Sequence, residues 1–189
     1  ATQDTTVEQG ETIIIDITEV SGGSASENDT QQQTVTIIDD DAPTVTDGAI
    51  SINAGSGTGN AFKIGDTVTA TWNNTATGDN GSGITGVTVD FSQFGGGAAV
   101  TANNNNQSWT ASYTIVAGTI DATGRNVSVA ASNAGGKTTT ADTTNATVDN
   151  VAPTVTDAQI SVAGGSGTSG AFKVGDTVTS TWNNTGTGE

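Results

Sequence analysis

The sequence predicts an all-β protein, and its composition and its periodicity both point to that fold class. Thr, Val, Gly and Asn are abundant, while Leu is absent from the 189 residues. Thr and Val favour strands because their side chains branch at Cβ, whereas Gly and Asn favour turns. Apolar and polar residues alternate in short segments such as Thr67–Trp72 and 127–129. This period of two is typical of half-buried strands.

An internal repeat gives the domain organisation. Residues 43–79 recur at 153–189 with 26 identities in 37 aligned positions, at a shift of 110 residues. A unit of roughly 100 residues with short strands fits an immunoglobulin-like sandwich of about seven strands. We therefore expect tandem immunoglobulin-like β-sandwiches with partial domains at both ends: the C-terminal part of one domain at 1–41, a complete repeat at 42–150 and the N-terminal part of the next at 151–189. Neighbouring repeats of the same chain would complete the partial ones.

The complete repeat contains seven segments with strand character. We expect them at 45–52, 67–72, 84–91, 98–102, 109–115, 126–131 and 138–148. The Gly-rich segment 54–60 is expected to be a loop, Asn103–Asn106 a polar turn, and Asn80-Gly81 a further turn. The large apolar side chains are expected to form the core rather than an exposed sugar-stacking surface; they are Phe62, Trp72, Trp109 and Tyr113.

Composition also excludes several classes of protein. The chain has no Cys and no His, which removes thiolate and imidazole metal sites and every nucleophile–histidine pair. Its formal charge of −16 repels phosphate backbones, so we expect no nucleic-acid partner. No apolar run reaches the roughly 18 residues that span a bilayer, so we expect no membrane insertion. Carboxylate pairs can act as acid and base, but nothing singles out one pair, and we do not expect an enzyme.

Carboxylates gather where one domain ends and the next begins. Residues 1–41 hold ten acids and no base, and three consecutive aspartates follow the apolar segment 34–38. Neighbouring carboxylates repel by about 1 kcal/mol in water, and by more where water is excluded. Ca²⁺ relieves such repulsion, because it accepts six to eight oxygen ligands in flexible geometry. The predicted calcium ligands at this junction are Asp39, Asp40 and Asp41.

The second junction resembles the first in sequence. Asp149 and Asn150 align with Asp39 and Asp40, and in both places Ala-Pro-Thr follows. A cation between the end of one domain and the loops of the next would fix their angle. The candidate ligands are therefore Asp149 and Asn150, with Asp47, Asp66 and Asp79 from the loops. The alternative is a solvated acidic surface with aspartates that cap turns.

Residues 4–12 and 34–41, with the closing apolar strand and its aspartate triplet, resemble the second half of a Calx-beta domain. This resemblance implies calcium ligands at Asp4, Glu8, Asp39, Asp40 and Asp41. Segments 42–45, 65–68, 79–84 and 127–136 resemble bacterial immunoglobulin-like repeats of giant secreted adhesins. That second resemblance implies a bacterial protein outside the cell or on its surface, without disulfides and stiffened by Ca²⁺.

We therefore expect a structural extender segment of a long extracellular, calcium-stiffened repeat protein such as an adhesin, a biofilm matrix fibre or a filament. Its partners would be neighbouring repeats of the same chain or, in a filament, other copies. The alternative is a glycan- or protein-binding immunoglobulin-like module of a cell-surface or surface-layer protein. That reading predicts an exposed patch that differs between copies, whereas the aromatic residues Phe62 and Trp72 recur as Phe172 and Trp182.

Overall fold

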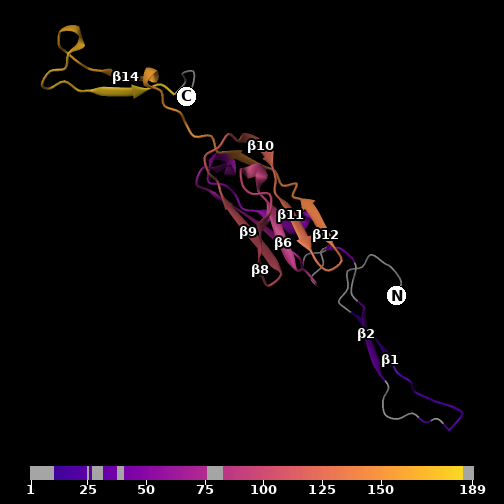
Figure 1. Cartoon of the computed structure of the whole chain (residues 1–189). Coiled ribbons are helices and arrows are strands. Elements are labelled where there is room, and N and C mark those ends of the chain that lie inside the picture. The colour runs from indigo at the N-terminus through magenta and orange to yellow at the C-terminus, as the bar shows by residue number, and fades with distance from the viewer. Residues whose placement is uncertain (1–10, 25, 27–31, 38–40, 76–82, 185–189) are drawn as a thin grey trace. The chain divides into compact units, whose positions relative to one another are not determined.

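The computed structural model describes residues 11–24, 26, 32–37, 41–75 and 83–184. Within these ranges every regular element is a β-strand or a one-turn 3₁₀ helix, which confirms the all-β prediction (Figure 1). The chain divides into two compact units, Ala1–Asn150 and Val151–Glu189. No helix in the described ranges is long and apolar enough to cross a membrane.

A two-stranded antiparallel ladder precedes the first core. Strand β1 (Glu11–Ile15) pairs with β2 (Gln33–Ile37), and Ile13 lies opposite Val35. The apolar side chains of this ladder are largely exposed, with 58% of Ile14 accessible. The sequence makes strands here because β-branched residues dominate both segments.

One four-stranded sheet has the order β3-β5-β9-β8. It comprises β3 (Ile50–Ile52), β5 (Thr67–Asn73), β8 (Asn103–Asn105) and β9 (Ser108–Thr114). Strand β5 alternates strictly, so Val68, Ala70 and Trp72 are buried while the threonines between them face outward. It pairs with β9 along its whole length, with Trp72 opposite Trp109.

A second four-stranded sheet has the order β12-β11-β6-β7. It comprises β6 (Gly86–Asp90), β7 (Val100–Thr101), β11 (Ser128–Ser132) and β12 (Lys137–Ala141). Three of its valines, Val87, Val89 and Val129, are buried in the same cluster as Trp72 and Trp109 of the first sheet. The two sheets thus share one core, an arrangement consistent with a β-sandwich.

A small third sheet closes one end of this core. Its order is β10-β13-β4, with β10 (Asp121–Arg125), β13 (Ala146–Asp149) and β4 (Phe62–Lys63). Strands β13 and β4 are parallel, so the last strand of the unit lies beside an early one. Phe62 is 1% exposed, and its ring meets that of Phe94 edge-on at 5.6 Å.

Several strand boundaries differ from the expected ones. The strand expected at 138–148 is two strands, β12 and β13, because the Asp142 carboxylate accepts the N–H of Thr144 and turns the chain there. The turn expected at Asn103–Asn106 is shifted, since β8 runs through Asn105 and the positive φ angles fall at Asn106 and Gln107. Strands β4, β8 and β10 were not predicted. The loop expected at 54–60 is present, with a 3₁₀ turn at Thr58–Asn60, and Asn80-Gly81 lies outside the described residues.

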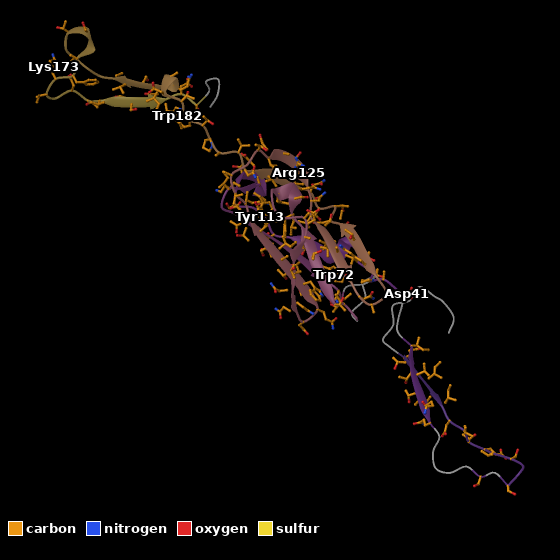
Figure 2. The ribbon with its side chains drawn as sticks, in the orientation of Figure 1. Asp41, Trp72, Tyr113, Arg125, Lys173 and Trp182 are labelled. Atoms are coloured by element: carbon orange, nitrogen blue, oxygen red, sulfur yellow. The ribbon has the colours of Figure 1, made fainter. Side chains whose placement is uncertain are left out.

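The second unit repeats one hairpin of the first. Strands β14 (Ile160–Ala163) and β15 (Thr179–Trp182) pair with Ile160 opposite Trp182, as Ile50 lies opposite Trp72 in β3 and β5. The environment of the two tryptophans differs, because Trp72 is 1% exposed and Trp182 is 43% exposed. Figure 2 labels both side chains, the first inside the sandwich and the second on the hairpin.

Candidate functional site

The predicted calcium ligands fall into two groups. Asp41, Asp47, Asp66, Asp149 and Asn150 are placed by the structure, whereas the others lie outside the described residues: Asp4, Glu8, Asp39, Asp40 and Asp79. In the described ranges no three acidic side chains come together as a group that could hold a metal ion.

Asp66 holds the Gly-rich loop that precedes β5. Its Oδ1 accepts the Ser56 hydroxyl at 2.6 Å, and its Oδ2 accepts the backbone N–H groups of Ser56 at 2.9 Å and Lys63 at 3.1 Å. The hydroxyl of Ser56, followed by these amides, lowers the pKa of Asp66 below its ordinary value. Gly55 is required in this loop, because a Cβ there would collide with the Ala61 carbonyl.

The same set of hydrogen bonds recurs in the second unit. Asp176 accepts the Ser166 hydroxyl at 2.6 Å and the Lys173 N–H at 2.7 Å, and these bonds lower its pKa in the same way. Both copies of the repeat thus use this aspartate to close a loop. Since its carboxylate already accepts three donors in each copy, the contacts favour the turn-capping role over the metal-ligand role for Asp66.

The segment that enters the sandwich is tied down by Asn133. The Nδ2 group of Asn133 donates to the Asp41 carbonyl at 2.9 Å. Its Oδ1 accepts the N–H groups of Gly135 and Gly136 in the turn between β11 and β12. Gly136 has a φ of +152° and lies against Ala42, so a Cβ there would press on that residue at 3.3 Å. One asparagine therefore joins a hairpin turn to the incoming chain.

Two further contacts continue this anchoring along residues 43–47. The Thr140 hydroxyl on β12 donates to the Val45 carbonyl at 2.7 Å, and Val45 is only 6% exposed. Asp47 then accepts the Thr143 N–H at 2.8 Å and its hydroxyl at 2.6 Å. These Thr143 bonds, with a smaller contribution from Asp142, lower the pKa of Asp47. We call the contacts made by Asn133, Thr140 and Thr143 the entry anchor.

The segment that leaves the sandwich is held by Asn150. Its side chain is 2% exposed, and its Oδ1 accepts the Ile120 N–H at 2.8 Å. Its backbone N–H donates to the Ile120 carbonyl, and its own carbonyl accepts the Gly118 N–H, both at 2.8 Å. Asn150 therefore faces the interior, and its contacts support a structural role. Calcium binding by Asn150 stays a prediction.

Asp149 lies in a row of charged residues across the small sheet. Asp121 is opposite it on β10, and Lys63 is opposite it on β4. The three residues line an open cavity of about 520 Å³ that also includes Ser56 and Thr147. Like charges opposite each other on neighbouring strands are destabilising, and the third member of this row, Lys63, carries the opposite charge.

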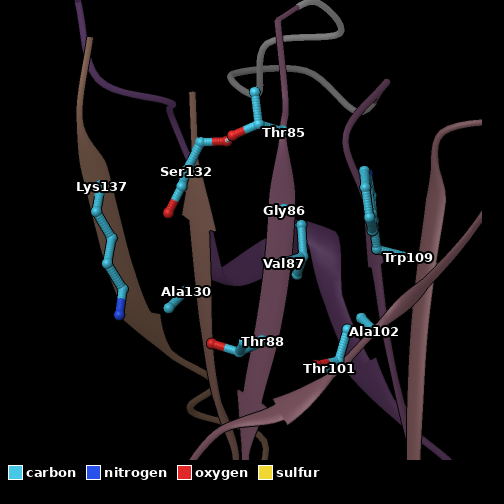
Figure 3. Close-up of a pocket in the computed structure, with 10 residues that line it drawn as sticks. All are labelled: Thr85, Gly86, Val87, Thr88, Thr101, Ala102, Trp109, Ala130, Ser132 and Lys137. Carbon is cyan, nitrogen blue, oxygen red and sulfur yellow. Dashed lines mark hydrogen bonds between the residues drawn. The ribbon is translucent and has the colours of Figure 1, made fainter. Parts of the chain in front are cut away.

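A second cavity, of about 420 Å³, lies over β6 (Figure 3). Gly86 and Thr88 stand on β6, with Lys137 to one side and Trp109 to the other (Figure 3). The Trp109 indole N–H is buried without a hydrogen-bond partner among the described residues. Gly86 leaves open the space that a Cβ would occupy, since nothing lies within 4 Å of that position.

Comparison of the chain with family models, with curated proteins and with solved structures gives no match in any of the three. The resemblances to Calx-beta and immunoglobulin-like repeats therefore stay predictions.

Sequence reasoning missed two residues that matter at these positions. Asn133 lies in the segment 127–136 that carries the resemblance to adhesin repeats, and its turn signal is the Ala-Gly-Gly that follows it. Asp142 falls within the strand expected at 138–148. The residues that follow it, Thr-Thr-Asn, are typical of the end of a strand and could have predicted the turn there.

Proposed function

We propose that this chain is a structural extender segment of a long extracellular repeat protein, in which immunoglobulin-like sandwiches follow one another along the chain. The observation that carries the proposal is the repeated hairpin. Trp72 and Trp182 occupy the same register position in two copies of one hairpin, and the apolar face that is buried in the first copy is exposed in the second. Such a face requires the remaining strands of the same sandwich, which a tandem array supplies.

The change in exposure extends over the whole face. Val45, Phe62 and Val68 are 6%, 1% and 0% exposed in the first unit. Their counterparts Val155, Phe172 and Val178 are 55%, 45% and 62% exposed. Burying side chains of this size stabilises a domain by about 1.5–3 kcal/mol each. The second unit therefore needs a segment with the pattern of β6 to β13, which would complete its own sandwich.

The anchors at entry and exit support a mechanical role. Asn133 fixes the chain where it enters the sandwich, and Asn150 fixes it where it leaves. Both asparagines bond to backbone groups of other segments, so the points at which the chain joins its neighbours belong to the rigid part of the fold. A load-transmitting segment needs this property, because a loose attachment would absorb extension before the sandwich bore any force.

Calcium enters the proposal through charge. With 20 acidic and 4 basic side chains, self-repulsion opposes a compact array, and divalent cations reduce it. We infer an extracellular or cell-surface location in bacteria from the resemblance to adhesin repeats, with the Calx-beta-like segment 1–41 as a second calcium-dependent part. Partners are neighbouring repeats, and other copies in a filament are the alternative.

Solution scattering on the full chain tests the proposal. The radius of gyration is measured at 5 mM CaCl₂ and again after an excess of EGTA, with MgCl₂ as a control for ionic strength. We expect Ca²⁺ to narrow the distribution of sizes that the chain adopts in solution and to raise its melting temperature. Mg²⁺ should change both quantities less. Identical scattering curves and melting temperatures under all three conditions would reject calcium stiffening.

A binding module is the second candidate, and the cavity over β6 is the observation that favours it. Its wall combines Trp109 with the Thr88 hydroxyl and the Lys137 ammonium, a mixture that suits a sugar or a polar peptide. Glycan-array screening of the full chain against the variant Gly86→Val tests it, because valine fills the cavity on an extended strand without backbone strain. Binding that the variant loses supports a module, and an array without signal removes glycans as its ligands.

A further inference from the structure

Asp142 is the only acidic residue among the buried side chains of the described ranges, with 1% of its surface exposed. It follows β12, and its backbone N–H donates to the Val127 carbonyl at 2.9 Å. Its Oδ1 accepts the Thr144 N–H at 2.9 Å, but its Oδ2 is buried with no hydrogen-bond partner. A buried carboxylate oxygen without a partner is costly, so its position calls for a group that the protein part does not supply.

The Asp47 carboxylate reaches the same corner from the entry segment, because Thr143, the residue after Asp142, donates to both of its oxygens. A smaller contribution to the lowered pKa of Asp47 comes from hydrogen bonding with the Asp142 side chain, which agrees with two carboxyl groups that face each other. Two acids from distant parts of the chain thus meet beside Thr143, and one of them is withdrawn from water.

The chain has four basic residues, Lys63, Arg125, Lys137 and Lys173, and none of them is among the groups that act on Asp47. Two adjacent carboxylates in a partly dry site repel strongly. Either a cation or a shared proton must compensate for the repulsion.

We propose that the Oδ2 atom of Asp142 and the carboxylate of Asp47 bind a hard divalent cation, Ca²⁺, at the corner between β12 and β13. The proposal deepens the proposed function and rests on it, since it names residues through which calcium would act. Calcium accepts carboxylate, carbonyl and water oxygens together, so two carboxylates suffice when water completes the shell. Sites of this kind in extracellular modules have a Kd of about 0.1–1 mM.

The site would reinforce the entry anchor. Asp47 belongs to the 3₁₀ turn Asp47–Ala49 that leads into β3, and Asp142 belongs to the corner that follows β12. A cation between them joins the incoming segment to the far sheet, next to the Thr143 contacts. Calcium would then order the point at which the chain enters each repeat, and Asp157 holds the position of Asp47 in the second copy.

Thermal unfolding of the full chain at pH 7.5, with 10 mM CaCl₂ or with EGTA, tests the site in three proteins. Asp142→Asn keeps the acceptor for Thr144 and replaces the orphan oxygen by an amide that donates to Asp47, so the fold is preserved without metal. Asp157→Asn is the matched control, since it removes the equivalent acid of the other copy. We expect Ca²⁺ to raise the melting temperature of the wild type and of the control by about 5 °C or more, and to leave that of Asp142→Asn unchanged.

The possible outcomes separate the two proposals. If Ca²⁺ raises the melting temperature of Asp142→Asn as much as that of the wild type, the proposed site is rejected and calcium stiffening is not. If Ca²⁺ changes the melting temperature of none of the three proteins, both the site and calcium stiffening are rejected. If the two carboxyl groups share a proton instead, Ca²⁺ leaves the melting temperature unchanged. The wild type then becomes more stable as the pH falls from 7.5 to 5, and without metal Asp142→Asn is more stable than the wild type. Calorimetric titration of folded wild type and of Asp47→Asn with CaCl₂ gives a second measurement should Asp142→Asn not fold, and equal heats in both overturn the site.

Discussion

The side-chain amide of Asn133 donates to the Asp41 carbonyl at 2.9 Å, and the same side chain accepts two N–H groups of its own hairpin turn. A single residue thus joins two parts of the chain that lie 92 positions apart. Because the Asp41 carbonyl belongs to the incoming segment, this contact decides how firmly that segment is held. The amide is suited to the task, since it offers a donor and an acceptor at once.

Asn133→Ala is expected to destabilise the first unit by about 1–3 kcal/mol, because the three hydrogen bonds of the side chain are lost. Urea unfolding followed by circular dichroism measures the change. Asn103→Ala, at an exposed asparagine of β8, is the control and should change stability little. Amide exchange of the Gly135 and Gly136 N–H groups should also accelerate in Asn133→Ala. Unchanged exchange there would contradict the role given to Asn133.

Asn150→Ala is expected to cost about 2–4 kcal/mol, because it leaves the partly buried Ile120 N–H without its side-chain acceptor and opens a cavity. The control Asp149→Asn changes the adjacent, exposed residue and should have a much smaller effect. Comparing their urea midpoints at constant slope gives the difference directly. Equal midpoints would mean that the exit of the sandwich is not held by Asn150.

Local patterns in the sequence predict some strands of this fold, whereas contacts between distant segments are not predictable from it. Strands β5 and β9 were predictable because Val68, Ala70 and Trp72 alternate with threonines, and alternation is a local property. Strand β4 was not, since its two residues pair with β13 from the far end of the repeat. The role of Asp66 was ambiguous for a related reason: Gly-Asp signals both a turn and an oxygen ligand, and only the positions of Ser56 and Lys63 favour the turn. The orphan oxygen of Asp142 depends on burial, which no local pattern gives.

Acid is expected to weaken the hydrogen bonds that Asp66 accepts from Ser56 and Lys63. Its hydrogen bonds lower its pKa in the folded protein, so the stability they contribute is present above the ordinary pKa of about 3.9 and is lost as pH falls through the lower folded value. The melting temperature of the wild type should therefore fall below about pH 4 more steeply than that of Asp66→Ala. Melting curves from pH 5 to pH 2 measure the two slopes, and parallel curves would show that Asp66 contributes nothing to acid unfolding.

Completing the second repeat should bury Trp182. Extending the chain after Glu189 with a second copy of residues 80–150 supplies the strands that cover the equivalent face in the first unit, where Trp72 is 1% exposed. Trp182, now 43% exposed, should then emit at shorter wavelength and resist quenching by acrylamide. Trp182 is isolated by the changes Trp72→Phe and Trp109→Phe, made in both the original and the extended chain, with phenylalanine also at the position of Trp109 in the appended copy. As a control, the appended copy carries Val87→Asp and Val129→Asp, which prevents its sheet from packing. Emission that is as red-shifted in the extended chain as in this control would show that the two hairpins, despite their common register, do not belong to the same kind of sandwich.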